Sequence, residues 1–181
     1  MAETPKVLTA LLAQLPDNTT GDISPEDIRD VVVSLFPSRG QLDLTAGGTT
    51  TFALTNTWYK LVCTTALDGG LGQDGFSQAS NNEIRATKAV NQVLLCMATI
   101  EASSSGNNKT YSFTFAKNGT VISTAHVSEK FETSGAVKTM TVIALVPTVQ
   151  NDTISVYVRN DTDTTSLTTA NLTLSALGFI R

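Results

Sequence analysis

The sequence is poor in charge. Of its 181 residues, 15% are charged, and the net charge of -4 comes from scattered acidic residues rather than from a run. No stretch of Lys or Arg provides the positive footprint with which proteins bind nucleic acid or anionic membranes. No segment approaches about 18 uninterrupted apolar residues, the length that a membrane-spanning helix needs. These absences predict a protein that neither binds nucleic acid nor inserts into a membrane.

Cysteine and histidine are also scarce, with two cysteines and one histidine in the chain. Cys63 and Cys96 lie inside apolar, strand-like runs, so we expect buried, reduced thiols, with a disulfide between adjacent strands as the alternative. Because His126 is the sole histidine, a metal site with two histidine ligands within one chain is excluded. A Ser-His-Asp triad would have to use the same residue.

Other patterns that resemble catalytic or binding motifs are better explained as turns and surface loops. Residues 70–75, GLGQDG, have Gly-x-Gly-x-x-Gly spacing, but no helix begins there as a dinucleotide site requires. Asp152, Asp161 and Asp163 lie in turn-like segments and supply too few oxygens for Ca²⁺. No Gly-x-Ser-x-Gly elbow presents a serine. We therefore predict a protein that is not an enzyme and uses no cofactor or metal.

The first 37 residues carry the clearest helix signals. Residues 5–15 place leucines at helical spacing, Ser24 followed by Pro25 is typical of a helix start, and Pro37 ends the second helix. Helices this short are not stable alone, so they must pack on a partner or cap the β-domain of their own chain. We favour a two-helix anchor over residues 1–37. Its predicted interaction residues are Leu8, Leu11, Leu12, Leu15, Ile28, Val31, Val32, Leu35 and Phe36.

The rest of the chain has the pattern of strands and turns. Residues 38–57 are rich in Gly and Thr and are expected to form a linker with an irregular strand. Asn118-Gly119 predicts a type I′ hairpin turn. The sequence thus predicts a mainly β domain over 58–181, an antiparallel jelly-roll sandwich. The expected strands are 58–65, 83–88, 92–103, 109–117, 120–130, 137–146, 153–160 and 169–180.

Two of these strands are apolar on both faces, namely QVLLCMATI (92–100) and MTVIALV (140–146). A sandwich of two layers gives each strand only one core, so the second face needs a cover. The cover is either residues 38–56 of the same chain or identical sheets of neighbouring subunits, and a closed ring of subunits is favoured. The predicted core and trimer residues are Leu94, Cys96, Tyr111, Phe113, Phe115, Ile143, Leu145 and Tyr157.

The segment LLAQLPDNTTGDISPEDIRDVVVSLFP resembles the N-terminal segment of many tailed-bacteriophage virion proteins, where it precedes a β-rich domain. The remainder, from NTWYKLV through TYSFTFAKNGTVI to ISVYVRNDT and LTLSALGFI, is similar to the domain that those proteins carry, a jelly roll like that of tumour necrosis factor and usually trimeric. The resemblance implies a structural virion protein, a homotrimeric head fibre or capsid decoration (cement) protein. It also implies attachment to other virion proteins through the N-terminal helices.

The alternative within the same resemblance is a receptor-binding module of a tail fibre. Its loops 67–82 and 160–168 would then contact a saccharide or protein of the host surface. The chain has no shaft of repeats and no coiled-coil heptads, which favours the head or capsid role. Either way the resemblance implies a location in the virion, after synthesis in the cytoplasm of a bacterial host.

Overall fold

The computed structural model describes residues 38–44, 47–63, 74–80, 82–89 and 91–180. All nine anchor residues lie outside this range, so the two-helix anchor over 1–37 stays a prediction. The described residues form eleven strands. Among them there is no helix long and apolar enough to cross a membrane.

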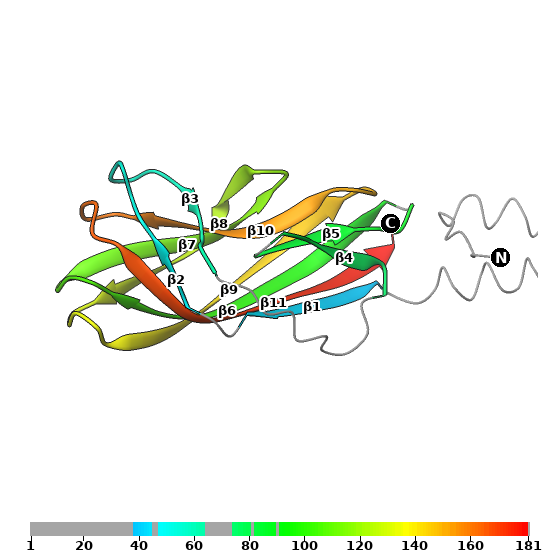
Figure 1. Ribbon diagram of the computed structural model, residues 1–181. Helices are drawn as coiled ribbons and strands as arrows, with labels where there is room; N and C mark the ends of the chain where they lie inside the picture. The colour runs from blue at the N-terminus through cyan, green and yellow to red at the C-terminus, as the bar shows by residue number, and fades with distance from the viewer. Residues whose placement is uncertain (1–37, 45–46, 64–73, 81, 90, 181) are drawn as a thin grey trace, which may run out of the picture.

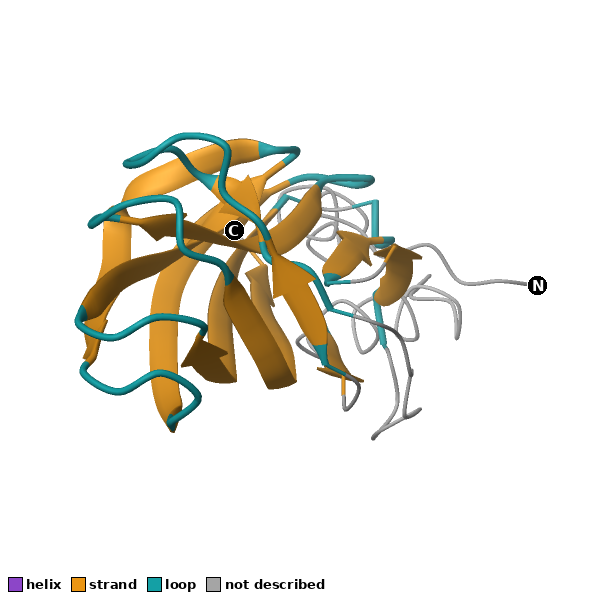
Figure 2. Cartoon of the chain, turned by 60° about the vertical axis from the view of Figure 1, so that its left-hand side comes forward, coloured by secondary structure: helices purple, strands orange, loops and turns teal. Residues whose placement is uncertain are grey.

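The strands form two antiparallel sheets that pack on each other (Figure 1, Figure 2). The five-stranded sheet has the order β1-β11-β6-β9, and β2 also pairs with β11. Its strands are β1 (Arg39–Leu44), β2 (Gly48–Thr50), β6 (Gln92–Ser104), β9 (Val137–Thr148) and β11 (Leu167–Ile180).

The six-stranded sheet has the order β4-β5-β10-β7-β8, and β3 also pairs with β10. β10 lies between β5 and β7 in this sheet although it comes much later in the chain, as expected for a jelly roll and unlike a simple meander. Its strands are β3 (Tyr59–Lys60), β4 (Phe76–Ser80), β5 (Glu83–Ala86), β7 (Lys109–Lys117), β8 (Thr120–Phe131) and β10 (Thr153–Asn160).

The antiparallel sandwich is confirmed, with differences near its N-terminal side. Strands predicted at 109–117 and 153–160 coincide with β7 and β10, whereas the strand predicted at 58–65 is reduced to β3 among its described residues. β4 has no counterpart in the prediction. β1 and β2 fall within the predicted linker 38–57, yet they pair with β11 and are part of the sandwich. Their backbone hydrogen bonds make this segment part of the domain.

The predicted hairpin turn between β7 and β8 is confirmed. Asn118 and Gly119 have φ of 50° and 76°, the two positive values that a type I′ turn requires. Asn56, Asn108 and Asn151 also have positive φ in turns or bends. Asn tolerates this backbone region better than other side chains, which explains why Asn recurs between the strands.

Side chains from both sheets fill the space between them. Five of the predicted residues, Leu94, Cys96, Tyr111, Phe113 and Phe115, are fully buried there. Cys63 and Cys96 are free thiols, and burial raises the pKa of each to about 12. The expectation of buried, reduced cysteines is therefore confirmed, and thiols with such a high pKa are inert at neutral pH.

The sandwich has two distinct ends. β1 begins beside the end of β11, at Arg39 opposite Leu177, and we call this the basal end because the chain enters there. The loops 105–108, 132–136 and 161–166 connect strands at the opposite, distal end, where the backbone N–H of Gly135 donates to the carbonyl of Ser104. Ser38, the first described residue, therefore lies at the end opposite these loops.

Candidate interaction surfaces

The outward side of the five-stranded sheet exposes large apolar side chains. Ile143 and Leu145 on β9 are 57% and 66% exposed, and Met97 on β6 is 42% exposed. Soluble monomers seldom expose contiguous apolar area of this kind without a partner. We call this surface the apolar face and define it as Val93, Leu95, Met97, Ile143, Leu145, Leu177 and Phe179.

Strand register brings these residues together. Leu95 lies opposite Leu177 of β11 on one side and opposite Leu145 of β9 on the other, while Met97 lies opposite Ile143. Side chains opposite each other in antiparallel strands are close enough to touch, so the apolar face is continuous across three strands. A groove between β1, β11 and β6 overlaps this face. Leu95, Met97 and Leu177 line the groove, and Arg39 and Gln41 form its polar edge.

Toward the distal end the same outward surface becomes polar. The hydroxyls of Thr99 and Thr141 lie 3.4 Å apart, and the Asn171 amide donates to the Glu101 carboxylate at 2.5 Å. The apolar face is thus confined to the basal part of the sheet. Contact with a partner copy would bury apolar side chains near the base and hydrated polar ones nearer the distal end.

The predicted core and trimer residues separate into three groups. Five are buried between the sheets, as described above. Ile143 and Leu145 are not core residues, because their positions on β9 alternate with the inward-facing Val142 and Ala144. Tyr157 is not a core residue either and is not on the apolar face. It is half-buried on the outward side of the six-stranded sheet, opposite Thr114 and Lys60.

Residues 38–56 are the predicted alternative cover of the apolar face within one chain. β1 and β2 extend the five-stranded sheet sideways through their pairing with β11. Leu42, Leu44 and Phe52 point into the core. Further along, the backbone N–H of Asn56 donates to the carbonyl of Asn160 at the distal end. The described parts of residues 38–56 therefore do not lie over the apolar face, which removes the alternative of a cover from this segment.

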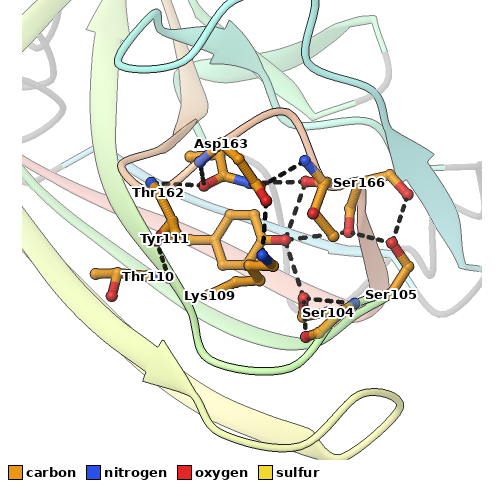
Figure 3. Close-up of polar contacts among 11 residues, drawn as sticks. Ser104, Ser105, Lys109, Thr110, Tyr111, Thr162, Asp163 and Ser166 are labelled. Carbon is orange, nitrogen blue, oxygen red and sulfur yellow. Dashed lines mark hydrogen bonds and ion pairs between the residues drawn. The ribbon is translucent and has the colours of Figure 1, made fainter.

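A dense polar network holds the distal loop 161–166 (Figure 3). The buried hydroxyl of Tyr111 lies 3.0 Å from the Ser104 hydroxyl and donates to the carbonyls of Thr165 and Ser166. Burial raises the pKa of Tyr111, so the phenol stays protonated and remains a donor. Tyr111 thereby joins the core to the distal loop.

Asp163 is the charged centre of this network. Its carboxylate accepts a hydrogen bond from the Lys109 ammonium at 2.6 Å and another from the backbone N–H of Thr165 at 2.8 Å. The Asn160 side-chain amide donates a third at 3.1 Å. The Lys109 hydrogen bond is the main cause that lowers the pKa of Asp163 well below its ordinary value. The part of loop 160–168 that was predicted to contact a receptor is thus a fixed structure. Of the other predicted loop, 67–82, residues 67–73 and 81 lie outside the described residues, and Phe76–Ser80 form strand β4 rather than a loop.

A second exposed cluster lies on the outward side of the six-stranded sheet. Trp58 is half-buried, with the Arg159 guanidinium carbon 4.7 Å from its ring centroid and the His126 ring centroid at 6.5 Å. Arg159 donates to Asp161 at 2.5 Å. The tryptophan patch, as we name it, consists of Trp58, His126, Ser128, Arg159 and Asp161.

Among the described residues, the contacts of His126 are not those of a catalytic triad. It is exposed on β8, its Nδ1 lies 2.9 Å from the carbonyl oxygen of Ser123, and its ring contacts Trp58. Within the part of the chain that the structure describes, no three His, Cys, Asp or Glu side chains gather as metal ligands do. These contacts give His126 a place on a surface rather than in a catalytic arrangement.

Several residues of these surfaces were not predicted from the sequence. Leu95 and Met97 lie in the run that was recognised as apolar on both faces. Leu177 and Phe179 of β11 were missed, although β11 follows the same pattern. Their signal was present, since LTLSALGFI also carries apolar residues at both odd and even positions. The tryptophan patch had no such signal, because its members come from three separate segments.

Comparison with known proteins gives matches in structure alone. No family model and no curated protein sequence matches the chain. Murine APRIL superposes with a TM-score of 0.52 at 12% identity, over 79% of this chain and 99% of that one. Eiger TNF from S. frugiperda superposes with a TM-score of 0.50 at 9% identity, over 78% of this chain and 93% of that one. At such low identity the likeness concerns the fold, and the described residues form an antiparallel β sandwich that resembles the fold of tumour necrosis factor proteins.

Proposed function

We propose that this chain is a structural protein of the bacteriophage virion surface, in which three copies associate through the apolar face to form a head fibre or capsid decoration protein. The apolar face is the observation that carries the self-association. Fully burying a Leu, Ile or Met side chain stabilises the buried state by about 1.5 to 3 kcal/mol. Burying several of them together therefore favours a permanent complex.

Identical copies suit this surface better than a different partner for a geometric reason. The exposed Ile143 and Leu145 lie on the edge strand β9, while the groove that Leu95 and Leu177 line extends to β1 on the other side of the sheet. One copy can therefore place its β9 edge on the groove side of the next. A contact between different patches closes into a ring when the rotation allows it, and a threefold ring satisfies every copy equally.

Sedimentation analysis of the Leu145→Asp variant tests the self-association. A charge on the β9 edge of the apolar face is expected to raise the dissociation constant at least ~100-fold and leave a folded single subunit. Leu54→Asp is the matched control, because Leu54 is 63% exposed but lies in the turn segment that leads to β3. Wild-type protein that sediments as a single subunit at micromolar concentration, or a control that dissociates equally, contradicts the proposal.

The virion role rests on the resemblance of the N-terminal segment and on where that segment joins the domain. The chain enters at the basal end, so an attachment through residues 1–37 leaves the distal loops directed away from the particle. A full-length Leu12→Asp, Val32→Asp variant keeps the β-domain intact and places charges on both predicted helix stripes. We expect it to stay associated yet lose binding to purified capsids. Undiminished capsid binding contradicts the anchor assignment.

Receptor binding by a tail-fibre module is the second candidate function. The distal network favours it, because Lys109, Tyr111 and Asn160 hold loop 161–166 in one conformation, which lowers the entropy lost on binding. Thr164 is exposed on this loop. A Thr164→Tyr virion whose host range changes while its capsid stability does not would favour the receptor role over the structural one.

A further inference from the structure

The tryptophan patch lies on the side of the sandwich opposite the apolar face. Register across the six-stranded sheet places Arg159 of β10 opposite Ser112 of β7, and Ser112 opposite Ser128 of β8. Trp58 directly precedes β3, whose Tyr59 lies opposite Val158. The patch therefore spans four strands in their distal part and stays outside any assembly formed through the apolar face.

Small side chains beneath the patch allow its large ones to meet. Ser112 and Thr114 point outward from β7, yet both are fully buried. Their small volume leaves room above the strand, where the rings of Trp58 and His126 approach each other at an interplanar angle of 67°. The result is a partly exposed indole held in a fixed orientation from two sides.

Three polar members of the patch, Arg159, Asp161 and Ser128, are connected by hydrogen bonds that run through Ser112. Arg159 donates to Asp161, and the Ser112 hydroxyl donates to the same carboxylate. The Ser112 hydroxyl also lies 2.6 Å from the hydroxyl of the exposed Ser128. Because Asp161 neutralises Arg159, the pair adds no net charge, and the protein itself carries a net charge of -4. An anionic ligand is thus disfavoured.

An oriented indole beside fixed donors and acceptors that carry no net charge matches the surface of a sugar. A sugar ring has an apolar C–H surface that packs on an aromatic plane and a rim of hydroxyls that both donate and accept. Carboxylate, guanidinium, imidazole and hydroxyl groups satisfy such a rim, with paired hydrogen bonds from the planar groups. A rigid aromatic residue gives contact area at a small entropic cost.

We infer that the tryptophan patch is a saccharide-binding site for neutral sugars with adjacent hydroxyls. The face of Trp58 that the Arg159 guanidinium does not cover supplies the stacking surface. Arg159 and Asp161 supply the paired hydrogen bonds, and His126 with Ser128 supplies the opposite rim. The site does not depend on self-association, because all its members belong to one chain and lie away from the apolar face. It goes beyond the proposed structural role by giving the exposed side of the domain a ligand.

The sole tryptophan makes the inference directly testable in the full-length protein. The probe is a panel of neutral tetrasaccharides built from glucose, galactose, mannose or N-acetylglucosamine. We expect at least one of them to change the Trp58 fluorescence saturably, with a dissociation constant of about 1 mM or tighter. Calorimetric titration of the same sugar should give the same constant.

Two variants and a control distinguish the patch from non-specific binding. His126→Ala removes an exposed ring and Arg159→Gln removes the stacked charge, and each is expected to weaken binding about tenfold or more. Lys130→Ala changes an exposed residue on the same strand outside the patch and should leave the affinity unchanged. The inference is overturned if no sugar of the panel binds, or if both patch variants bind as tightly as the wild type. Loss of self-association in Leu145→Asp protein, with sugar binding retained, would separate the two proposals.

Discussion

The two outward faces of this sandwich are built on the same backbone pattern and differ in what they expose. On the five-stranded sheet the outward positions of β6, β9 and β11 carry Leu, Met, Ile and Phe near the base. On the six-stranded sheet the outward positions of β7, β8 and β10 carry Ser, Thr, Arg and His. Strand alternation therefore decides which residues face outward, and their chemistry decides whether that face needs a partner.

Residues of one strand, β6, show the difference between the core and the apolar face. Ile100 and Met97 both lie on β6, but Ile100 is fully buried between the sheets while Met97 is on the apolar face. We expect Ile100→Ala to lower the free energy of unfolding by about 2 to 5 kcal/mol, because it leaves a cavity. Met97→Ala should cost each subunit only about 0.5 kcal/mol, with any further loss growing with protein concentration. Urea unfolding at two concentrations measures both, and equal losses would contradict the division into core and interface.

The polar face depends on hydrogen bonds beneath its surface. The Thr114 hydroxyl lies 2.6 Å from the Ile122 carbonyl oxygen and 2.7 Å from that of Ala125, where the β7–β8 register shifts. Thr114→Val keeps the shape and removes the donor, so we expect a loss of about 1 to 3 kcal/mol in the free energy of unfolding. Thr124→Val, at an exposed position of the neighbouring strand β8, should change stability by about 0.5 kcal/mol or less. Similar effects of the two variants would mean that the polar face is not held in this way.

Acid should act on the distal network before it acts on the apolar face. The folded-state pKa of Asp163 is lowered, first by the Lys109 hydrogen bond, so its stabilising contribution is present above the unfolded-state pKa of about 3.9. The contribution is lost as pH falls below that value toward the folded-state pKa. Thermal unfolding of Asp163→Asn protein should show a lower melting temperature at neutral pH and a weaker fall in that temperature under acid. An unchanged acid profile would mean that Asp163 contributes little, in keeping with its partly exposed side chain.

The smallest expected effect comes from extending the apolar face. Thr141 on β9 is exposed and lies at the polar limit of this face, opposite Thr99. Thr141→Val exchanges a hydroxyl for a methyl group, which partners can bury, so the association constant should rise about threefold. Sedimentation equilibrium measures the change, with Thr124→Val as the matched exchange on the other sheet. Weaker association of the Thr141 variant would place this end of the face outside the contact.

Much of the fold was predictable because the strands are long and their turns carry clear signals. β7 and β10 coincide with their predicted ranges, and Asn118-Gly119 forms the expected turn. The short strands β2 and β4 were not predicted, since three and five residues hold too little alternation to identify them. β1 was expected only as an irregular strand, because its regularity comes from pairing with β11.

The apolar face was also only partly predictable from the sequence. The apolar face was partly visible because a run that is apolar at every position, such as QVLLCMATI, signals two buried sides without reference to other strands. Its extent across β11 depended on register and was missed. Ile143 and Leu145 could be assigned to the core or to an interface only once the phase of β9 was known.

By itself, the sequence determined that this chain makes an antiparallel β domain with buried thiols and at least two strands that are apolar on both sides. Alternation, turn residues and composition are local properties, so they can be read without knowing neighbours. The tertiary structure alone decided that β1 and β2 extend the sheet rather than cover it, and that Trp58, His126 and Arg159 meet above Ser112. Such contacts join segments far apart in the chain, and only the register between strands brings them together.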